Sequence, residues 1–228
     1  APGREGQDGS SGYGDLYGPE RPSVGIQLAI QRERIRKKWP DAGLIAYFQA
    51  HTNTYAPVET LLSLYEEALE QEGVCGLSIA TRPDALPEYV MEMLAHLSQR
   101  TYLTVELGLQ TIHDETARRL GRGYDTVCFT EAVARLKTRG IRTCVHLING
   151  LPGETRDQML DSVRFLAAQK VDGVKLQLLH ILSGTRLAED YATGRVVPMS
   201  REAYISTIAD QLELLPPEMV VERLTGDG

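Results

Sequence analysis

The stretch YLTVELGLQT, residues 102–111, decides the fold class of this chain. Its first part, Tyr102 to Leu107, is short, apolar and partly β-branched, as in a buried strand, and a polar turn, GLQT, follows it. The same pattern occurs in four more segments: LIAYF (Leu44 to Phe48), VCGLSIA (Val74 to Ala80), IRTCVHLI (Ile141 to Ile148) and VKLQLLHI (Val174 to Ile181). VVERL (Val220 to Leu224) is a candidate for a sixth strand.

Amphipathic helices are predicted between these strands. Apolar residues share a helical face within 58–69, 90–97 and 132–136, and Thr155 with Gln158 has the spacing of a capping box that opens a helix. Another helix is predicted from Arg201 to Leu215. Strand and helix alternate at intervals of about 30 residues, the period of βα units in an α/β protein with a parallel sheet. This period fits a partial barrel and an open doubly wound sheet equally well.

Composition narrows the class of protein. The chain has 228 residues, 42% of them hydrophobic, which is enough for one large core and therefore one main domain. Its net charge of −7 gives no support to a nucleic-acid partner, although it does not exclude one. No apolar run approaches the roughly 20 residues of a membrane span, and three scattered cysteines fit a reducing compartment. We expect a soluble, cytoplasmic protein.

The two ends of the chain differ from its centre. Residues 1–25 are rich in glycine and proline without apolar periodicity, so we expect a loop there and the main domain in residues 26–228. The first residue is Ala1, and the last residues, RLTGDG, are turn-like with nothing after them to pack. We therefore expect the chain to be part of a longer protein.

Three polar residues stand inside the apolar strands, each near a carboxyl end: Glu106, His146 and His180. A buried carboxylate or imidazole needs a hydrogen-bonding partner or a polar cavity. Since function in parallel α/β proteins lies at the carboxyl ends of the strands, these residues are candidates for a shared site, with satisfied core histidines as the alternative. No P-loop, G-x-S-x-G, H-E-x-x-H or G-x-G-x-x-G motif occurs.

Several phrases of the sequence occur together in one known family. They are KKW, IAYFQAHTNTYAPVE, GLSIATRPD, TYLTVELGLQTIHDETA, HLINGLPGET, LLHILSGT and DQLELLPPEMVVERLTGDG, and they span nearly all of the chain from Trp39 to Gly228, in order. Together they resemble the radical S-adenosylmethionine (SAM) superfamily, and closely its YhcC/YtqA-type branch, which is related to elongator-like and oxygen-independent coproporphyrinogen oxidase-like proteins.

The resemblance implies a partial (β/α)6 barrel of the TIM-like radical SAM type. It also implies a [4Fe-4S] cluster, held by three cysteines in a loop after the first barrel strand, with SAM bound to its open iron. An electron from a reductant such as flavodoxin or ferredoxin then cleaves SAM, and the 5′-deoxyadenosyl radical removes a hydrogen atom from a substrate that the sequence does not identify. No three-cysteine loop is present, so the cluster ligands are expected upstream of Ala1, and residues 1–25 correspond to the segment after that loop. The alternative is a cluster-free barrel that binds a nucleoside-like ligand or a protein partner without redox chemistry.

The resemblance also assigns candidate SAM-binding residues. Ala80 stands where elongator-like relatives have the glutamate of IETRPD, and Glu106 is a candidate to replace that carboxylate. Glu106 is therefore expected to be functional rather than structural. The remaining candidates are Gln49, Thr52 and Asn53 for the methionine end of SAM, Gln110 and Arg122 after the next motif, His146 for the ribose or adenine, and His180 as a last-strand contact.

Overall fold

The computed structural model describes residues 22–225, and within them six strands form one wholly parallel sheet. Each strand pairs with the one before it, so the order in the sheet is β1-β2-β3-β4-β5-β6. The strands are β1 (Leu44–Phe48), β2 (Val74–Thr81), β3 (Tyr102–Gln110), β4 (Arg142–Asn149), β5 (Gly173–Leu178) and β6 (Val220–Arg223).

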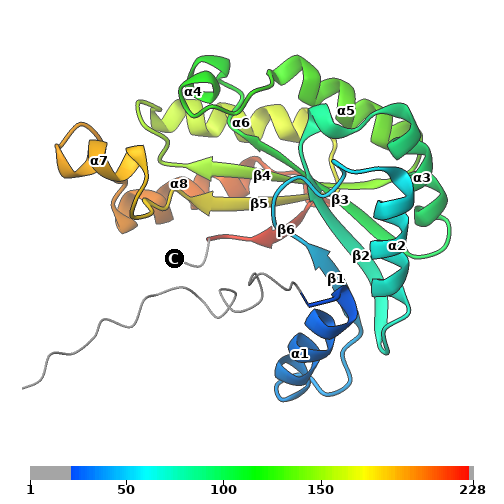
Figure 1. The fold of residues 1–228 in the computed structure, drawn as a ribbon. Coiled ribbons are helices and arrows are strands. Elements are labelled where there is room, and N and C mark those ends of the chain that lie inside the picture. The colour runs from blue at the N-terminus through cyan, green and yellow to red at the C-terminus, as the bar shows by residue number, and fades with distance from the viewer. Residues whose placement is uncertain (1–21, 226–228) are drawn as a thin grey trace, which may run out of the picture.

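The sheet curls into an open half-barrel with helices on its outer side (Figure 1). A doubly wound sheet needs a reversal of strand order, and none occurs among the described strands. The expected partial barrel is therefore confirmed.

Apart from α1, which precedes β1, the helices lie between the strands in sequence. They are α1 (Val24–Arg36), α2 (Val58–Leu69), the 3-10 turn η2 (Pro83–Ala85), α3 (Glu88–Ser98), α4 (Asp114–Arg119), α5 (Thr126–Thr138), α6 (Arg156–Gln169), α7 (Arg186–Ala192) and α8 (Arg201–Leu214). The predicted capping box is present, because Thr155 Oγ1 accepts from the Gln158 backbone N–H and Gln158 Oε1 accepts from the Thr155 N–H. The sequence did not predict α1, α4 or α7, whose few buried side chains leave little apolar periodicity to find.

Side-chain alternation divides each strand between two environments. In β3, Val105, Leu107 and Leu109 are fully buried in the core that the strands share with the outer helices. Glu106 and Gln110 point to the concave side instead, where they line a pocket. The core therefore holds the strands while the concave face is free to carry polar chemistry.

Two strands end three residues away from their predicted ends, while the other ends agree to within one residue. β3 continues through Gln110, three residues beyond the predicted end, whereas β5 stops at Leu178 rather than Ile181. Beyond Leu178 the neighbouring β4 has ended, and the last bond between these two segments runs from the Leu179 N–H to the Asn149 carbonyl (2.9 Å). Of the predicted loop at residues 1–25, residues 1–21 lie outside the described part, and α1 begins at Val24, where Ser23 caps it.

Candidate functional site

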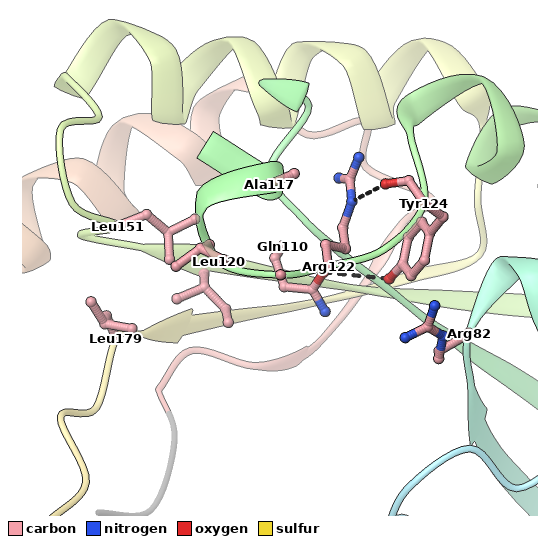
Figure 2. Close-up of a pocket in the computed structure, with 10 residues that line it drawn as sticks. Arg82, Gln110, Ala117, Leu120, Arg122, Tyr124, Leu151 and Leu179 are labelled. Carbon is pink, nitrogen blue, oxygen red and sulfur yellow. Dashed lines mark hydrogen bonds between the residues drawn. The ribbon is translucent and has the colours of Figure 1, made fainter. Parts of the chain in front are cut away.

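Two adjoining pockets open at the carboxyl ends of the strands. The polar pocket, about 280 Å³, is lined by Tyr47, Gln49, His51, Ala80, Thr81, Arg82, Glu106, Gly108, Gln110, Tyr124, His146 and Gln177. The apolar pocket, about 360 Å³, is lined by Arg82, Gln110, Ala117, Leu120, Gly121, Arg122, Tyr124, Ile148, Leu151 and Leu179 (Figure 2). Arg82, Gln110 and Tyr124 belong to both pockets and form their shared wall.

Glu106 is the centre of the polar pocket's floor. Its carboxylate accepts hydrogen bonds from Tyr47 Oη (3.0 Å), His146 Nε2 (2.6 Å), Lys175 Nζ (2.5 Å) and Ser78 Oγ. These four partners come one each from β1, β4, β5 and β2. A single carboxylate on β3 thus contacts the other strands of the sheet except β6.

The electrostatics of this group favour an ionised Glu106. Burial raises the pKa of a carboxyl, but the hydrogen bonds from His146, Lys175 and Ser78 outweigh burial and lower the pKa of Glu106 to about 2. The side chain is only 2% exposed, and its two oxygens already accept four bonds. These contacts give Glu106 a structural role, so that its direct contact with a cofactor stays a prediction.

Several residues of the site were missed by the sequence prediction, among them Tyr47, Arg82, Tyr124 and Lys175. The ammonium of Lys175 lies between Glu106 and Glu222, 3.6 Å from the latter, and stands 4.5 Å from the centroid of the Tyr47 ring. The sequence analysis did not select Lys175, which stands in the apolar run VKLQLLHI. An ionisable residue in a buried strand is nevertheless the same signal that indicated Glu106.

Gln110 lies where the sequence analysis expected a site residue. It ends β3 with a φ of 60°, a left-handed conformation that non-glycine residues rarely adopt. Its side chain lines both pockets, and Tyr124 Oη donates to the Gly108 carbonyl beside it and to Gln110 Oε1 (3.5 Å). Strained residues of this kind are often found at ligand sites.

Arg122 is near Gln110, but its guanidinium is directed away from the Gln110 amide (Figure 2). Nη1 donates to the Leu109 and Thr111 carbonyls (2.9 and 2.6 Å), Nε donates to the Tyr124 carbonyl (2.8 Å) and Nη2 to Asp114 (2.7 Å). Arg122 therefore supports the backbone on both sides of Gln110. Its contact with SAM stays a prediction.

The three candidates after β1 divide between pocket and scaffold. Gln49 is exposed and lines the polar pocket. Asn53 Nδ2 donates to the Phe48 and Ala80 carbonyls (2.8 and 2.9 Å), which joins the ends of β1 and β2. Thr52 is half-buried and lines neither pocket.

The two candidate histidines have different environments. His146 is on β4, lines the polar pocket and donates through Nε2 to the ionised Glu106. His180 was expected inside a strand, and this was wrong, because β5 ends two residues earlier and His180 is exposed. It lines neither pocket.

The cysteines do not form a cluster site. Cys75 is on β2, Cys128 on α5 and Cys144 is buried on β4. Over residues 22–225, no group of three or more His, Cys, Asp or Glu side chains is arranged to hold a metal ion. The residues of this chain therefore do not fit a [4Fe-4S] cluster.

Within residues 22–225, no helix combines the length and apolar character needed to cross a membrane.

Comparison with known families identifies the class of protein. Residues 24–166 match the model of the radical SAM superfamily, and residues 171–228 match that of the Radical_SAM C-terminal domain. The chain belongs to the radical SAM superfamily.

The relatives lie in the expected branch. The chain is 47% identical to YtqA of Bacillus subtilis (strain 168), over 96% of this chain and 68% of that protein. It is 36% identical to YhcC of Escherichia coli (strain K12), over 90% of this chain and 66% of that protein. The chain thus spans about two thirds of the length of these relatives. Elongator complex protein 3 of Schizosaccharomyces pombe is 30% identical over 75% of this chain and 32% of that protein.

Solved structures support the fold. The Elp3 of the archaeon Methanocaldococcus infernus, lacking its N-terminus, superposes with a TM-score of 0.75 at 22% identity, over 91% of this chain and 55% of that one. Coproporphyrinogen III oxidase (HemN) of Escherichia coli, described as a radical SAM enzyme, superposes with a TM-score of 0.56 at 18% identity, over 82% of this chain and 45% of that one. At these identities, the likeness is one of fold alone.

Proposed function

We propose that this chain is the SAM-binding part of a radical SAM enzyme. Together, SAM and a [4Fe-4S] cluster would supply a 5′-deoxyadenosyl radical that removes a hydrogen atom from a substrate of unknown identity, with a reductant such as flavodoxin or ferredoxin as the electron source. The cluster ligands are expected from residues upstream of Ala1. The proposal does not require a nucleic-acid partner, and the net charge of −7 gives no support to such a partner.

One observation carries the proposal: a polar and an apolar pocket adjoin at the carboxyl edge of the half-barrel and share Gln110 in their common wall. SAM has the same division, because a charged amino-acid end and ribose hydroxyls are joined to a flat adenine ring. Ile148, Leu151 and Leu179 offer apolar contact to a base, while the polar pocket offers donors and acceptors.

The residues of the polar pocket would divide the work of binding. When Nε2 of His146 donates to Glu106, Nδ1 is left as an acceptor for a ribose hydroxyl. Gln49 and Gln110 would bind the amino-acid end, and Asn53 and Arg122 would hold the loops that carry them. Contacts of Thr52 and His180 with SAM remain predictions.

Calorimetric titration of SAM into this chain tests the binding step, with saturable binding as the expected result. A version extended upstream through a three-cysteine loop should take up a [4Fe-4S] cluster and release 5′-deoxyadenosine on reduction. An extended protein that binds SAM but holds no cluster would favour the cluster-free alternative. Failure of both proteins to bind SAM would contradict the proposal.

A further inference from the structure

Two arginines stack on the ring of Tyr124 in the wall between the pockets. The Cζ atoms of Arg82 and Arg122 lie 5.2 and 4.9 Å from the ring centroid. Both positively charged groups are thus close to Gln110, but they differ in the number of donors that remain for a ligand.

Arg122 has almost none left. Four hydrogen bonds to Leu109, Thr111, Asp114 and Tyr124 use four of the five N–H groups of its guanidinium, and its side chain is 4% exposed. A ligand could reach this guanidinium only by breaking the contacts that shape the loop after β3.

Arg82, which follows β2, differs from Arg122 because it still has donors free for a ligand. Asp84 accepts from Nε (2.9 Å) and Nη2 (2.6 Å), which occupies one edge of the guanidinium. The other edge, formed by Nη1 and the second N–H of Nη2, has no hydrogen-bond partner among the described residues. The side chain is 43% exposed, lines both pockets and is directed towards Tyr124 (Figure 2).

The chain also leaves space for this guanidinium. Gly123 has a φ of +84°, and a Cβ there would lie 2.9 Å from Nη2 of Arg82. A side chain at position 123 would therefore press on Arg82, so the glycine serves both the turn and the position of the arginine.

We propose that the free edge of Arg82 binds the carboxylate of SAM, and that Arg122 is a positioning residue that holds the backbone around Gln110. A guanidinium edge matches a carboxylate with two parallel N–H···O bonds, which are stronger than neutral hydrogen bonds. Asp84 would orient Arg82 from the opposite edge. This assignment rests on the proposed function, since it takes SAM as the ligand.

The test compares two ligands that differ only in this carboxylate: SAM and decarboxylated SAM. Calorimetry measures their affinities for the wild-type chain, Arg82→Gln, Arg82→Lys and Arg164→Gln. Arg164 is the control, because it is 53% exposed, pairs with Asp161 (2.7 Å) and lines neither pocket. A melting curve for each variant checks that the fold is retained.

We expect Arg82→Gln to weaken SAM binding about ten- to a hundredfold, the usual loss for a hydrogen bond to a charged group. Arg82→Lys should lose less affinity for SAM, because it keeps the charge but not the two parallel N–H donors of the guanidinium. Arg164→Gln should bind SAM as tightly as the wild type. Decarboxylated SAM should bind the wild type and Arg82→Gln equally.

Two results would overturn the assignment while leaving the proposed function intact. One is an unchanged affinity for SAM in Arg82→Gln, and the other is an equal loss of affinity for both ligands, which would mean that Arg82 does not recognise the carboxylate. If neither the wild-type chain nor the version extended upstream bound either ligand, the proposed function itself would be contradicted, and this assignment with it.

Discussion

Replacement of Glu106 by glutamine should destabilise the fold. The pKa of Glu106 falls from an ordinary 4.5 to about 2, which corresponds to about 3 kcal/mol of folding free energy at neutral pH. Glutamine would also leave Lys175, which is 8% exposed, beside a neutral amide. Breaking a buried ion pair costs about 3–5 kcal/mol. We expect the free energy of unfolding to drop by about 3 kcal/mol at pH 7.

The pH dependence has a definite sign. Because the folded pKa of Glu106 is depressed, its contribution is complete above the unfolded pKa near 4.5 and is lost as the pH falls towards 2. The stability difference between the wild type and Glu106→Gln should therefore be large at pH 7 and shrink below about pH 4. Other carboxylates titrate in both proteins, so their effects cancel in this comparison.

Urea unfolding at pH 7 and at pH 3 measures the effect. Glu66→Gln is a matched control, because Glu66 forms an exposed pair with Arg100 and exposed pairs contribute about 0–1 kcal/mol. Equal stability of Glu106→Gln and the wild type at pH 7 would refute the reasoning. If the variant were also unchanged in stability but bound SAM more weakly, the carboxylate would belong to the cofactor site, as the sequence analysis expected.

Three other outcomes are expected. Gln110→Ala should weaken SAM binding about tenfold in calorimetry with little change in melting temperature, because among the described residues the Gln110 amide makes a single 3.5 Å contact, and alanine is as strained as glutamine at this φ. Arg122→Ala should lower the unfolding free energy by about 3 kcal/mol in urea titrations, since four hydrogen bonds from a buried guanidinium are lost. An equally stable variant would mean that these bonds do not support the loop. Anaerobic incubation with iron and sulfide should give this chain no [4Fe-4S] absorbance, because its cysteines lie on three separate elements, and stable cluster uptake would contradict that.

The sheet was predictable because its strands are short apolar runs at a regular spacing. β1 was predicted with its observed bounds, whereas the predicted end of β5 lay three residues too far along the chain. Its apolar run continues past Leu178, but a strand needs a partner, and β4 has already ended at Asn149. Hydrophobic pattern locates a strand's core, while ladder hydrogen bonds, which involve a distant part of the chain, set where it ends.

The candidate site was predictable only in part, for a related reason. Polar residues after the predicted strands indicated Gln49 and Gln110, and a polar residue inside an apolar strand indicated His146; all three line the polar pocket. The sequence could not tell that the donors of Asn53 are used by carbonyls of β1 and β2, or that those of Arg122 are used by carbonyls around the end of β3. That depends on backbone conformation, such as the left-handed φ of Gln110, rather than on residue type.

The partners of Glu106 also bear on the order of folding events. Tyr47 and Lys175 are 128 residues apart, and Glu106 is 69 residues from Lys175. All of these contacts can form together only after the five strands β1 to β5 are in place. Closing such long loops costs entropy, so these contacts are expected to form late in folding. Interactions that form after the folding transition state act mainly on the unfolding rate. The carboxylate of Glu106 would then contribute to kinetic stability. Its loss would speed unfolding on the order of a hundredfold and leave the rate of folding nearly unchanged.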